Sequence, residues 1–597
     1  MDNNLHTFHI PVMGTGHSID TPIRVAPYGI SSVISLVDDL LLEKIRSYYC
    51  KKFNLPFEKI PRQEEDGRAK RTTAYLNMVD EVVKIKFNEI KSQPFFVNSE
   101  KDRYFMLLPT ESPLRISYLK MKSMEIGSER DSIEKYLTDL MRPGSIDVNI
   151  MVKLDKINYV DKLPLSDEFS DAKAALRGYA QSRVSSGIVF SAGINQALFG
   201  YMAKFKDFYR DESGRICKKI ILKVSDFRSA MIQGKFLSRK GLEVHEFRIE
   251  SGLNCGGHAF PSEGELLPPL LEEFKEKRHT LKQQFLPAII KYYEDLGLRY
   301  PESAMHEEPL LTVQGGIGTY GEDLRLRQDY GVDRTGWGSP FLLVPEATCV
   351  DNATVQLLCK ATDDDLYLSG ASPLGIPFNN VRGSGSDRWT RQQAEQGDPG
   401  SACPKGFLVS NVEFSQLPIC TASKEYQSQK LKELCDLQVD QNEKDKMIRT
   451  VLEKACICDH LGNGALIALG LARETLAPQS ICPGPNIAWF DRVYTLEEMV
   501  DHIYGRGRSL VSDQRPHMYA KEIRMYLTWV AGLMDSALSD AKQNARVKKI
   551  LQSLTEGVEY CSKMAHTKAQ IGENLASLVD ECQKAMLEIG TMQAKLV

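Results

Sequence analysis

A histidine follows a cysteine and two adjacent glycines in the short stretch ESGLNCGGHAFP, residues 250–261. The ordinary pKa of an imidazole lies near neutrality, so His258 could act as an acid or a base at physiological pH. Gly256 and Gly257 present no side chain and let the backbone pass close to a ligand. Cys255 adds a thiol that is either a nucleophile or a small buried side chain. This stretch is the first candidate for a catalytic loop.

Two further glycine-rich stretches could bind a phosphate group. They are GGIGTYGED, residues 315–323, and GWGSPF, residues 336–341. Glycines let backbone N–H groups approach an anion, and a helix that begins after the first stretch would add its positive end. One such stretch alone could be a tight turn, but two at successive strand ends favour a phosphate site. The candidate ligands are Gly315, Gly316, Gly318, Gly338 and Ser339.

These stretches follow short apolar, β-rich runs that alternate with helix-like segments, which is typical of a parallel sheet covered by helices. Eight such runs span residues 6–13, 31–37, 146–154, 187–192, 219–224, 244–250, 310–314 and 334–343. We therefore predict an α/β fold, a (β/α)8 TIM barrel with its chemistry at the carboxyl ends of the strands. An open doubly wound sheet is the alternative, because one sequence does not fix the number of strands.

The barrel is expected to occupy residues 1–350, with a large insertion after the second strand at about 49–143 that could cap the barrel mouth. Residues 351–515 form a post-barrel region that contains cysteine, glycine and proline, within which residues 372–384 could act as a substrate lid. From residue 516 to 597 the apolar period is helical, as in the series Val547, Ile550, Leu554, Val558, Cys561, Ile571, Leu575, Leu578, Cys582 and Met586. This C-terminal helical appendage either covers the core of its own chain or joins two copies in a homo-oligomer.

The composition excludes several classes of partner. The formal net charge is −4 and charged residues make up 26% of the chain with both signs interspersed, which argues against nucleic acid as a partner. The first residues lack a basic segment followed by an apolar one, and no window of about eighteen apolar residues occurs. We therefore expect a cytoplasmic protein that does not span a membrane and acts on a small-molecule substrate.

The order of five motifs along the chain is more specific than any one of them. Two of them come after the first and sixth runs, PVMGTGHS (11–18) and GLNCGGHAF (252–260). The other three lie at the third, seventh and eighth runs, DVNIMVK (147–153), LLTVQGGIGT (310–319) and GVDRTGWGSPFLLVPEA (331–347). Together they resemble the nitronate monooxygenase (2-nitropropane dioxygenase) family of FMN-dependent barrels and the related flavin-dependent enoyl-ACP reductases. The resemblance runs from about residue 8 to residue 347 and is interrupted by the insertion.

The resemblance implies FMN as cofactor and assigns roles to individual residues. Met13 and Gly14 would lie against the flavin ring, Asn149 would hydrogen-bond the cofactor, and Gly257 would bring the backbone near the ring. The five candidate phosphate ligands would hold the FMN phosphate, and His258 would be the catalytic base or proton donor. The substrate would be a small nitronate-like, carbonyl or unsaturated acyl compound.

The chain departs from the family pattern at two places that affect the flavin. RIESG stands where the family has a Gln-Gly pair, so Arg248 or Glu250 would take over the cofactor contact there. Ser339 replaces a more typical threonine and keeps the hydroxyl. Cys255 also resembles the loop cysteine with which IMP dehydrogenase and GMP reductase attack a purine, and this alternative stays open. A third alternative is a barrel that binds a phosphorylated ligand without redox activity, as a scaffold.

Five of the thirteen cysteines gather after the barrel, mostly beside proline, glycine or small residues. Turns of this kind suit thiolate ligands, and an iron-sulfur cluster near a flavin could relay electrons. Their spacings match neither zinc ribbons nor ferredoxins, so ordinary reduced thiols are the alternative. His460 could be a further ligand, and three adjacent carboxylates, residues 363–365, could bind a divalent ion or form a solvated loop. The predicted metal ligands are Cys403, Cys420, Cys456, Cys458 and Cys482.

Overall fold

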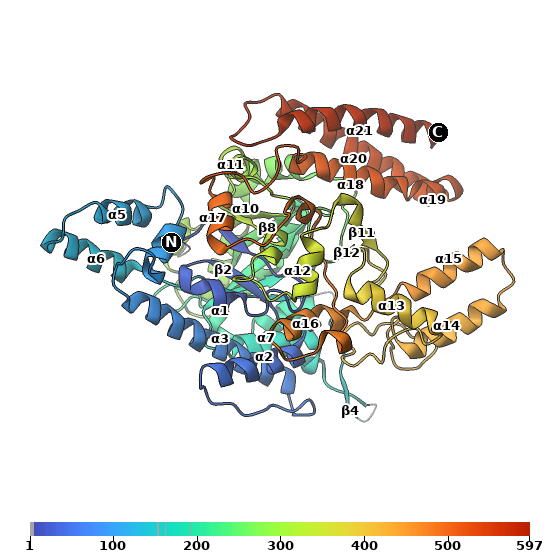
Figure 1. Ribbon diagram of the computed structural model, residues 1–597, viewed down its shortest axis with the longest axis horizontal. Coiled ribbons are helices and arrows are strands. Elements are labelled where there is room, and N and C mark those ends of the chain that lie inside the picture. The colour runs from blue at the N-terminus through green and yellow to red at the C-terminus, as the bar shows by residue number, and fades with distance from the viewer. Residues whose placement is uncertain (1–4, 152–154, 161–162, 192, 597) are drawn as a thin grey trace.

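In the computed structural model, eight parallel strands close into a barrel (Figure 1). The structure describes the chain except for residues 1–4, 152–154, 161–162, 192 and 597. The strand order is β1-β10-β9-β8-β7-β6-β3-β2, and β1 closes the ring because His9 is in register with Gly336 on one side and Ser31 on the other. The strands are β1 (Phe8–Ile10), β2 (Ser31–Ser35), β3 (Ile146–Ile150), β6 (Ser186–Phe190), β7 (Lys218–Val224), β8 (Val244–Glu250), β9 (Leu310–Gln314) and β10 (Arg334–Gly336).

Each predicted run overlaps one of these strands, so the (β/α)8 fold is confirmed and the open sheet is excluded. Residues 152–154 and 192, at the ends of two predicted runs, lie outside the described residues. The eighth strand is shorter than predicted because Pro340 follows the glycines, and Ser339–Leu343 forms a 3-10 helix instead. The helices between and after the strands cover the outside of the barrel (Figure 1). They are α1 (Thr21–Val25), α2 (Asp39–Lys52), α7 (Asp171–Ala180), α8 (Gln196–Met202), α9 (Phe227–Ser238), α10 (Leu267–Asp295), α11 (Tyr320–Asp329) and α12 (Asn352–Leu358).

The insertion after the second strand is helical and lies beside the barrel. It consists of α3 (Gly67–Ser92), α4 (Glu100–Leu107), α5 (Pro113–Lys122) and α6 (Ser128–Leu140). The long helix α3 packs against α2 and α7, while α5 and α6 project away from the barrel on the left of Figure 1. None of its described residues lines the cavity at the barrel mouth, so the expectation that the insertion caps the mouth is wrong.

The post-barrel region is ordered rather than a single loop. It contains the hairpin β11 (Leu366–Ser369) and β12 (Phe378–Val381), followed by α13 (Gly385–Glu395), α14 (Lys424–Asp436), α15 (Gln441–Leu452), α16 (Ile457–Ala468) and α17 (Leu496–Ile503). A small hairpin, β4 (Tyr159–Val160) with β5 (Leu163–Pro164), precedes α7. No helix in the described part of the chain is long and apolar enough to cross a membrane.

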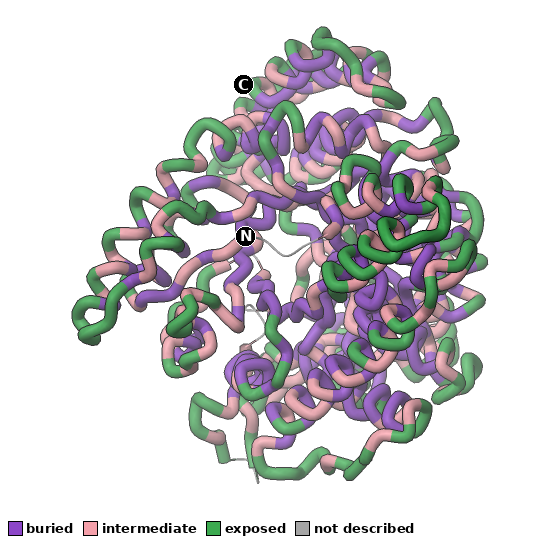
Figure 2. The backbone as a smooth tube through the Cα atoms, turned by 90° about the vertical axis from the view of Figure 1, so that its left-hand side faces the viewer, coloured by how far each residue is buried: buried purple, intermediate pink, exposed green. Residues whose placement is uncertain are grey.

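Four helices complete the chain and share the barrel's hydrophobic core. They are α18 (Met518–Ala531), α19 (Met534–Ser539), α20 (Ala541–Ala565) and α21 (Leu575–Lys595). The predicted stripe on α20 is fully buried, because α20 packs against α10, α18 and α21. In the second predicted series, Leu575, Leu578 and Cys582 are buried on α21, whereas Met586 is 38% exposed and Ile571, in the loop between α20 and α21, is 80% exposed. Figure 2 shows buried and exposed residues alternating along the outer helices, as expected for a cover on the core.

Candidate functional site

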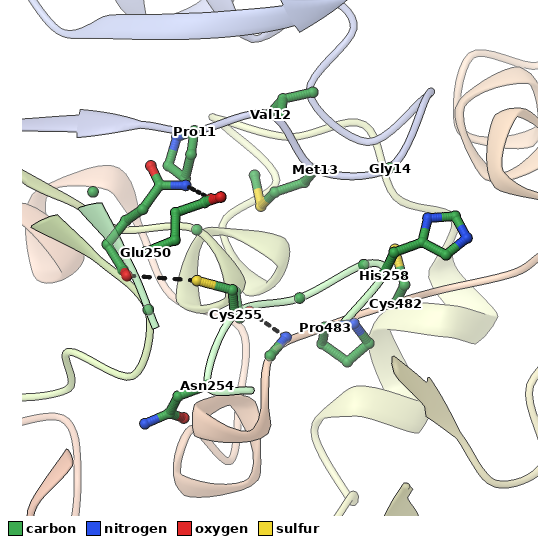
Figure 3. A pocket seen from close by; sticks show the side chains of 18 of the residues that line it. Pro11, Val12, Met13, Gly14, Glu250, Asn254, Cys255, His258, Cys482 and Pro483 are labelled. Atoms are coloured by element: carbon green, nitrogen blue, oxygen red, sulfur yellow. Dashed lines mark hydrogen bonds between the residues drawn. The ribbon is translucent and has the colours of Figure 1, made fainter. Parts of the chain in front are cut away.

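A cavity of about 260 Å³ lies at the carboxyl ends of the barrel strands (Figure 3). Its walls come from strand ends and the loops after them, and its roof comes from residues 258, 260, 378, 461, 482–484 and 486. In Figure 3, Glu250 and His258 lie on opposite sides of the view with Met13 between them. The predicted site residues that line the cavity are Met13, Gly14, Asn149, Gly257, His258, Gly315, Gly316, Gly338 and Ser339. The structure thus brings together residues from five separate motifs.

Gly315 and Gly316 form one wall of the cavity and require glycine. Their φ angles are 109° and 79°, in the region that side chains rarely adopt. The loop of Asn254 and Cys255 also packs directly on them, so a Cβ atom on Gly316 would overlap the Asn254 amide. No hydrogen bond among the described residues uses the N–H groups of Gly315, Gly316 or Gly338. These donors are therefore free for an anion at this wall.

Gly318 does not belong to this wall, and its prediction as a phosphate ligand is wrong. Its N–H donates to Glu322 Oε2 at 2.8 Å, and Gly318 does not line the cavity. Glu322 Oε1 in turn accepts from Arg515 at 2.7 Å, and this carboxylate sits in the first turn of α11. Glu322 therefore occupies the positive end of the helix that was expected to face a phosphate.

Arg248 is a second correction, since it does not line the cavity. Its side chain is 1% exposed and forms ion pairs with Glu246 and with Asp147 Oδ2, the latter at 3.4 Å. Side chains alternate along a strand, so Glu246, Arg248 and Glu250 share the inner face of β8 at successive heights. Only Glu250, at the end of the strand, reaches the mouth. The strand end that departs from the family pattern therefore presents a carboxylate.

Glu250 belongs to a polar cluster that the sequence analysis missed. Lys223 Nζ lies 2.8 Å from Glu250 Oε1, and the Gln314 amide also donates to Glu250. Lys223 is the next-to-last residue of β7, and Glu250 and Gln314 end the neighbouring strands β8 and β9; all three residues line the cavity. The sequence signal for this cluster was Lys223, next to the last residue of the apolar run KKIILKV. A side chain at this position of a barrel strand lies near the mouth of the barrel.

His258 faces the cavity from the roof and is held by the β11–β12 hairpin. Its Nε2 lies 2.7 Å from Ser372 Oγ, and its ring meets the Phe378 ring edge-on at 5.1 Å. The backbone around it pairs with the hairpin, since the Asn379 N–H donates to Gly257 O at 2.9 Å. Burial lowers the pKa of His258 to about 4, so the imidazole is neutral at pH 7. A neutral imidazole is the form that accepts a proton.

The hairpin accounts for the predicted lid. The Asn379 amide donates to the backbone oxygens of Cys255 and Gly257 at 3.0 and 3.1 Å, so β12 fixes the loop that carries His258. Asn380 and Arg382 point elsewhere, because both contact Tyr367 on β11. Of the predicted lid, Phe378 therefore lines the cavity and Ser372 and Asn379 contact the loop of His258, whereas residues 380–384 continue toward α13.

The segment CPGPN, residues 482–486, completes the roof and was also missed. The Gly257 N–H donates to Cys482 O at 3.0 Å, and the Gly484 N–H donates to Ser339 Oγ at 2.7 Å. Ser339 accepts this bond, so its own hydroxyl hydrogen remains available to a ligand. Asn486 Nδ2 donates to Ile317 O at 2.7 Å. The segment thus ties the catalytic loop to the glycine wall.

Six polar atoms of cavity-lining residues are buried without a hydrogen-bond partner among the described residues. They are Thr15 Oγ1, Nδ1 and Nε2 of His17, Asn149 Oδ1, Asn254 Oδ1 and Gln314 Oε1. Leaving such an atom unpaired costs about 1–3 kcal/mol, so each is a point at which a polar ligand would gain binding energy. Asn149 is the residue for which the family resemblance implies a cofactor contact.

Cys255 has the properties of a buried thiol rather than an activated one. Its Sγ lies 3.5 Å from Gln314 O, and burial together with the nearby Glu250 carboxylate raises its pKa well above the usual value. A nucleophilic cysteine needs a lowered pKa. The environment of Cys255 therefore disfavours attack on a purine.

The five predicted metal ligands do not form a coordination site. Cys482 lines the cavity, whereas Cys403, Cys420, Cys456 and Cys458 do not. Among the described residues, no group of three or more His, Cys, Asp or Glu side chains could hold a metal ion. The iron-sulfur prediction thus finds no ligand set in this arrangement.

The other predicted metal ligands have structural partners. His460 Nδ1 lies 2.7 Å from Ser386 Oγ, and its ring packs against Trp389. Asp363 pairs with Lys521 at 2.8 Å, and Asp365 caps its own turn through Thr362. These contacts explain the residues without a metal ion.

Comparison with known proteins adds little beyond the fold. No family model matches the sequence, and no curated protein sequence matches it. Among solved structures, the chain is similar to the enoyl reductase domain of MlnA, from the macrolactin biosynthesis cluster of Bacillus amyloliquefaciens. The similarity covers 84% of this chain and 94% of that one, at 14% sequence identity and a TM-score of 0.39. Values this low leave the function to be argued from the site.

Proposed function

We propose that this protein is an FMN-dependent oxidoreductase of the nitronate monooxygenase type that uses His258 as its acid or base. The observation that carries the proposal is one cavity with free glycine N–H groups on one wall and a neutral imidazole in its roof. This combination suits a phosphorylated cofactor whose other end meets a proton-transfer group. The substrate is a small nitronate-like, carbonyl or unsaturated acyl compound.

The residues present fit FMN. Gly315, Gly316, Gly338 and Ser339 would hold its phosphate with backbone N–H groups and one hydroxyl, and Asn149 would satisfy its unpaired Oδ1 against a polar edge of the ring. Met13 would supply an apolar surface between the phosphate site and the polar edge of the ring. When bound, the flavin supplies the hydride or electron chemistry that amino-acid side chains cannot perform.

The chain's own contribution is proton transfer and exclusion of water. When Ser372 Oγ accepts from Nε2–H of His258, Nδ1 carries the free lone pair and takes the substrate proton. Phe378 and Leu461 close the roof with apolar side chains, which limits the substrate to small compounds. Lys223 and Glu250 neutralise each other, so they place polar groups at the mouth without adding net charge.

The test is cofactor content and redox response. We expect the purified protein, after incubation with FMN and gel filtration, to retain about one FMN per chain, and the flavin colour to bleach on anaerobic reduction. Oxygen consumption with a small alkyl nitronate then tests the activity. A protein that retains no flavin after this treatment would overturn the proposal. A protein that retains flavin but turns over neither a nitronate nor an enoyl thioester would restrict the proposal to cofactor binding.

Replacement of Cys255 by alanine separates this proposal from the purine-dehydrogenase alternative. We expect turnover within about threefold of wild type, because burial and the nearby Glu250 carboxylate keep the thiol protonated. Cys482→Ala is the matched control, since Cys482 is the other cysteine that lines the cavity. A loss of more than about a hundredfold with Cys255→Ala alone would instead favour covalent catalysis by this cysteine.

A further inference from the structure

One face of α18 holds the loop that carries His258, residues 251–262. Met518, Glu522 and Tyr526 are spaced by four residues, so they lie on the same side of the helix. Three hydrogen bonds join this face to the loop: Asn254 Nδ2 to Met518 O at 3.1 Å, Ser251 Oγ to Glu522 Oε1 at 2.5 Å, and the Ser262 N–H to Tyr526 Oη at 3.1 Å. Because α18 packs against α20 and α21, it links the loop to the C-terminal helices.

Glu522 is the ionisable member of this face. It is 2% exposed and has no ion-pair partner in the described part of the chain. Its Oε2 accepts a hydrogen bond from the Leu267 N–H, at the start of α10, at 3.0 Å. Burial raises the pKa of Glu522 to about 7, so the acid and the carboxylate are both populated near neutral pH. The ionisable groups close to it are neutral at that pH, because burial raises the pKa of each: Tyr519, Tyr526, Cys255 and Cys561.

Both forms of Glu522 can hold the loop. The carboxylate accepts from Ser251 Oγ and from the Leu267 N–H. In the acid, the O–H donates to Ser251 Oγ, and the other oxygen still accepts from Leu267. Ser251 Oγ can accept this bond in addition to the one from the Asn254 N–H at 3.2 Å, because a hydroxyl oxygen has two lone pairs. The loop therefore stays joined to α10 and α18 in either state.

We propose that Glu522 is a positioning residue for the reaction at the barrel mouth, where it acts through Ser251 to hold the loop of His258 against the glycine wall. The contact with that wall is direct. A Cβ atom on Gly315 would lie 3.4 Å from Ser251 Cβ, and one on Gly316 would lie 2.1 Å from Asn254 Nδ2. The inference rests on the proposed function, and it gives the C-terminal helices a role in that site.

Two replacements of Glu522 separate hydrogen bonding from packing. Glutamine reproduces the acid form, since its NH2 group donates to Ser251 and its oxygen accepts from Leu267, whereas leucine leaves both without a partner. In the FMN-free protein, we expect amide hydrogen exchange of residues 251–257 to be about fivefold or more faster in Glu522→Leu and within about twofold of wild type in Glu522→Gln. We expect Kd for FMN to rise by about tenfold or more in Glu522→Leu and by less than about threefold in Glu522→Gln.

Glu581→Leu is the matched control, because Glu581 on α21 pairs with Arg524 of α18 at 2.7 Å. We expect it to leave exchange of residues 251–257 unchanged. Ser251→Ala removes the loop side of the contact and leaves α18 intact, so it tests the inference even if Glu522→Leu does not fold. We expect it to accelerate exchange of the loop about as much as Glu522→Leu.

Three results would overturn the inference. The first is loop exchange equal to that of wild type in Ser251→Ala and in folded Glu522→Leu. The second is a loop as mobile in Glu522→Gln as in Glu522→Leu, and the third is the same acceleration in Glu581→Leu. A wild-type protein that binds no FMN would overturn the flavin proposal alone, because loop exchange is measured without the cofactor.

Discussion

Replacement of Gly316 by alanine is expected to weaken FMN binding by about a hundredfold or more. The residue has φ of 79°, where a side chain is strained by about 1 kcal/mol, and its Cβ atom would overlap the Asn254 amide. Asn254 cannot simply turn aside, because its Nδ2 donates to Met518 O at 3.1 Å. The 251–257 loop must therefore shift, and with it both the glycine wall and the catalytic loop. A hundredfold change in Kd corresponds to about 2.7 kcal/mol.

Gly331→Ala is the matched control for this experiment. Gly331 also has positive φ, at 65°, but no atom lies within 4 Å of its Cβ position. Gly331→Ala has a similar backbone strain, but its Cβ atom overlaps no neighbouring atom. We therefore expect Kd for FMN to stay within about twofold of wild type. Fluorescence titration of FMN gives Kd, and thermal unfolding gives the stability of both variants. Equal Kd values for the two would show that the glycine wall does not bind the cofactor.

Replacement of His258 by glutamine is expected to lower kcat by about 10²- to 10⁴-fold while FMN binding changes little. Glutamine keeps a polar group within reach of Ser372 but cannot take a proton. Ser372→Ala serves as the comparison, because it leaves the imidazole and removes only its partner, and we expect it to lower kcat by about tenfold or less. For both variants, steady-state turnover of a small nitronate gives kcat, and the flavin content of the purified protein reports FMN binding.

The pH dependence gives a second readout of His258. Its pKa is lowered to about 4 by burial, so the neutral base persists from pH 8 down to about pH 5. We expect kcat/KM to fall only as the pH drops through about 4, where the imidazole gains its proton, and His258→Gln to lack this acidic limb. Because its folded pKa lies below the unfolded value of 6.5, the same group also lowers stability as the pH falls from about 6.5 to 4. A midpoint near pH 6.5 for activity would contradict the buried site.

The local sequence pattern was sufficient to predict the barrel and many of the residues at its mouth. Runs such as LLTVQ and VHEFRIE are apolar, rich in β-branched or aromatic residues and bounded by turn residues, and they became β9 and β8 without change of limits. The glycine motifs were placed correctly because strand ends of a closed barrel converge on one side. His258 entered the same cavity for that reason.

The errors have specific physical causes. Alternation along a strand places Arg248 and Glu250 on the same face of β8, but it does not show which of the two lies at the level of the cavity. That choice required the position of each side chain along the barrel axis. The interaction of Gly318 with Glu322 had a visible signal, since Thr319 and Glu322 have the spacing of a helix N-terminal cap. Contacts of His258 with Ser372, and of Ser339 with Gly484, join residues more than a hundred positions apart and leave no trace in local sequence.

The roof of the cavity has a consequence for how this protein can be divided. Phe378, Leu461 and the 482–486 segment come from the chain that follows the barrel, yet they touch the same ligand space as the strand ends. A truncated polypeptide that stops at residue 350 would keep all eight strands and lose one face of its binding chamber. Any shortened or transplanted version of this protein must therefore keep the barrel together with the later segments that carry Phe378, Leu461 and residues 482–486.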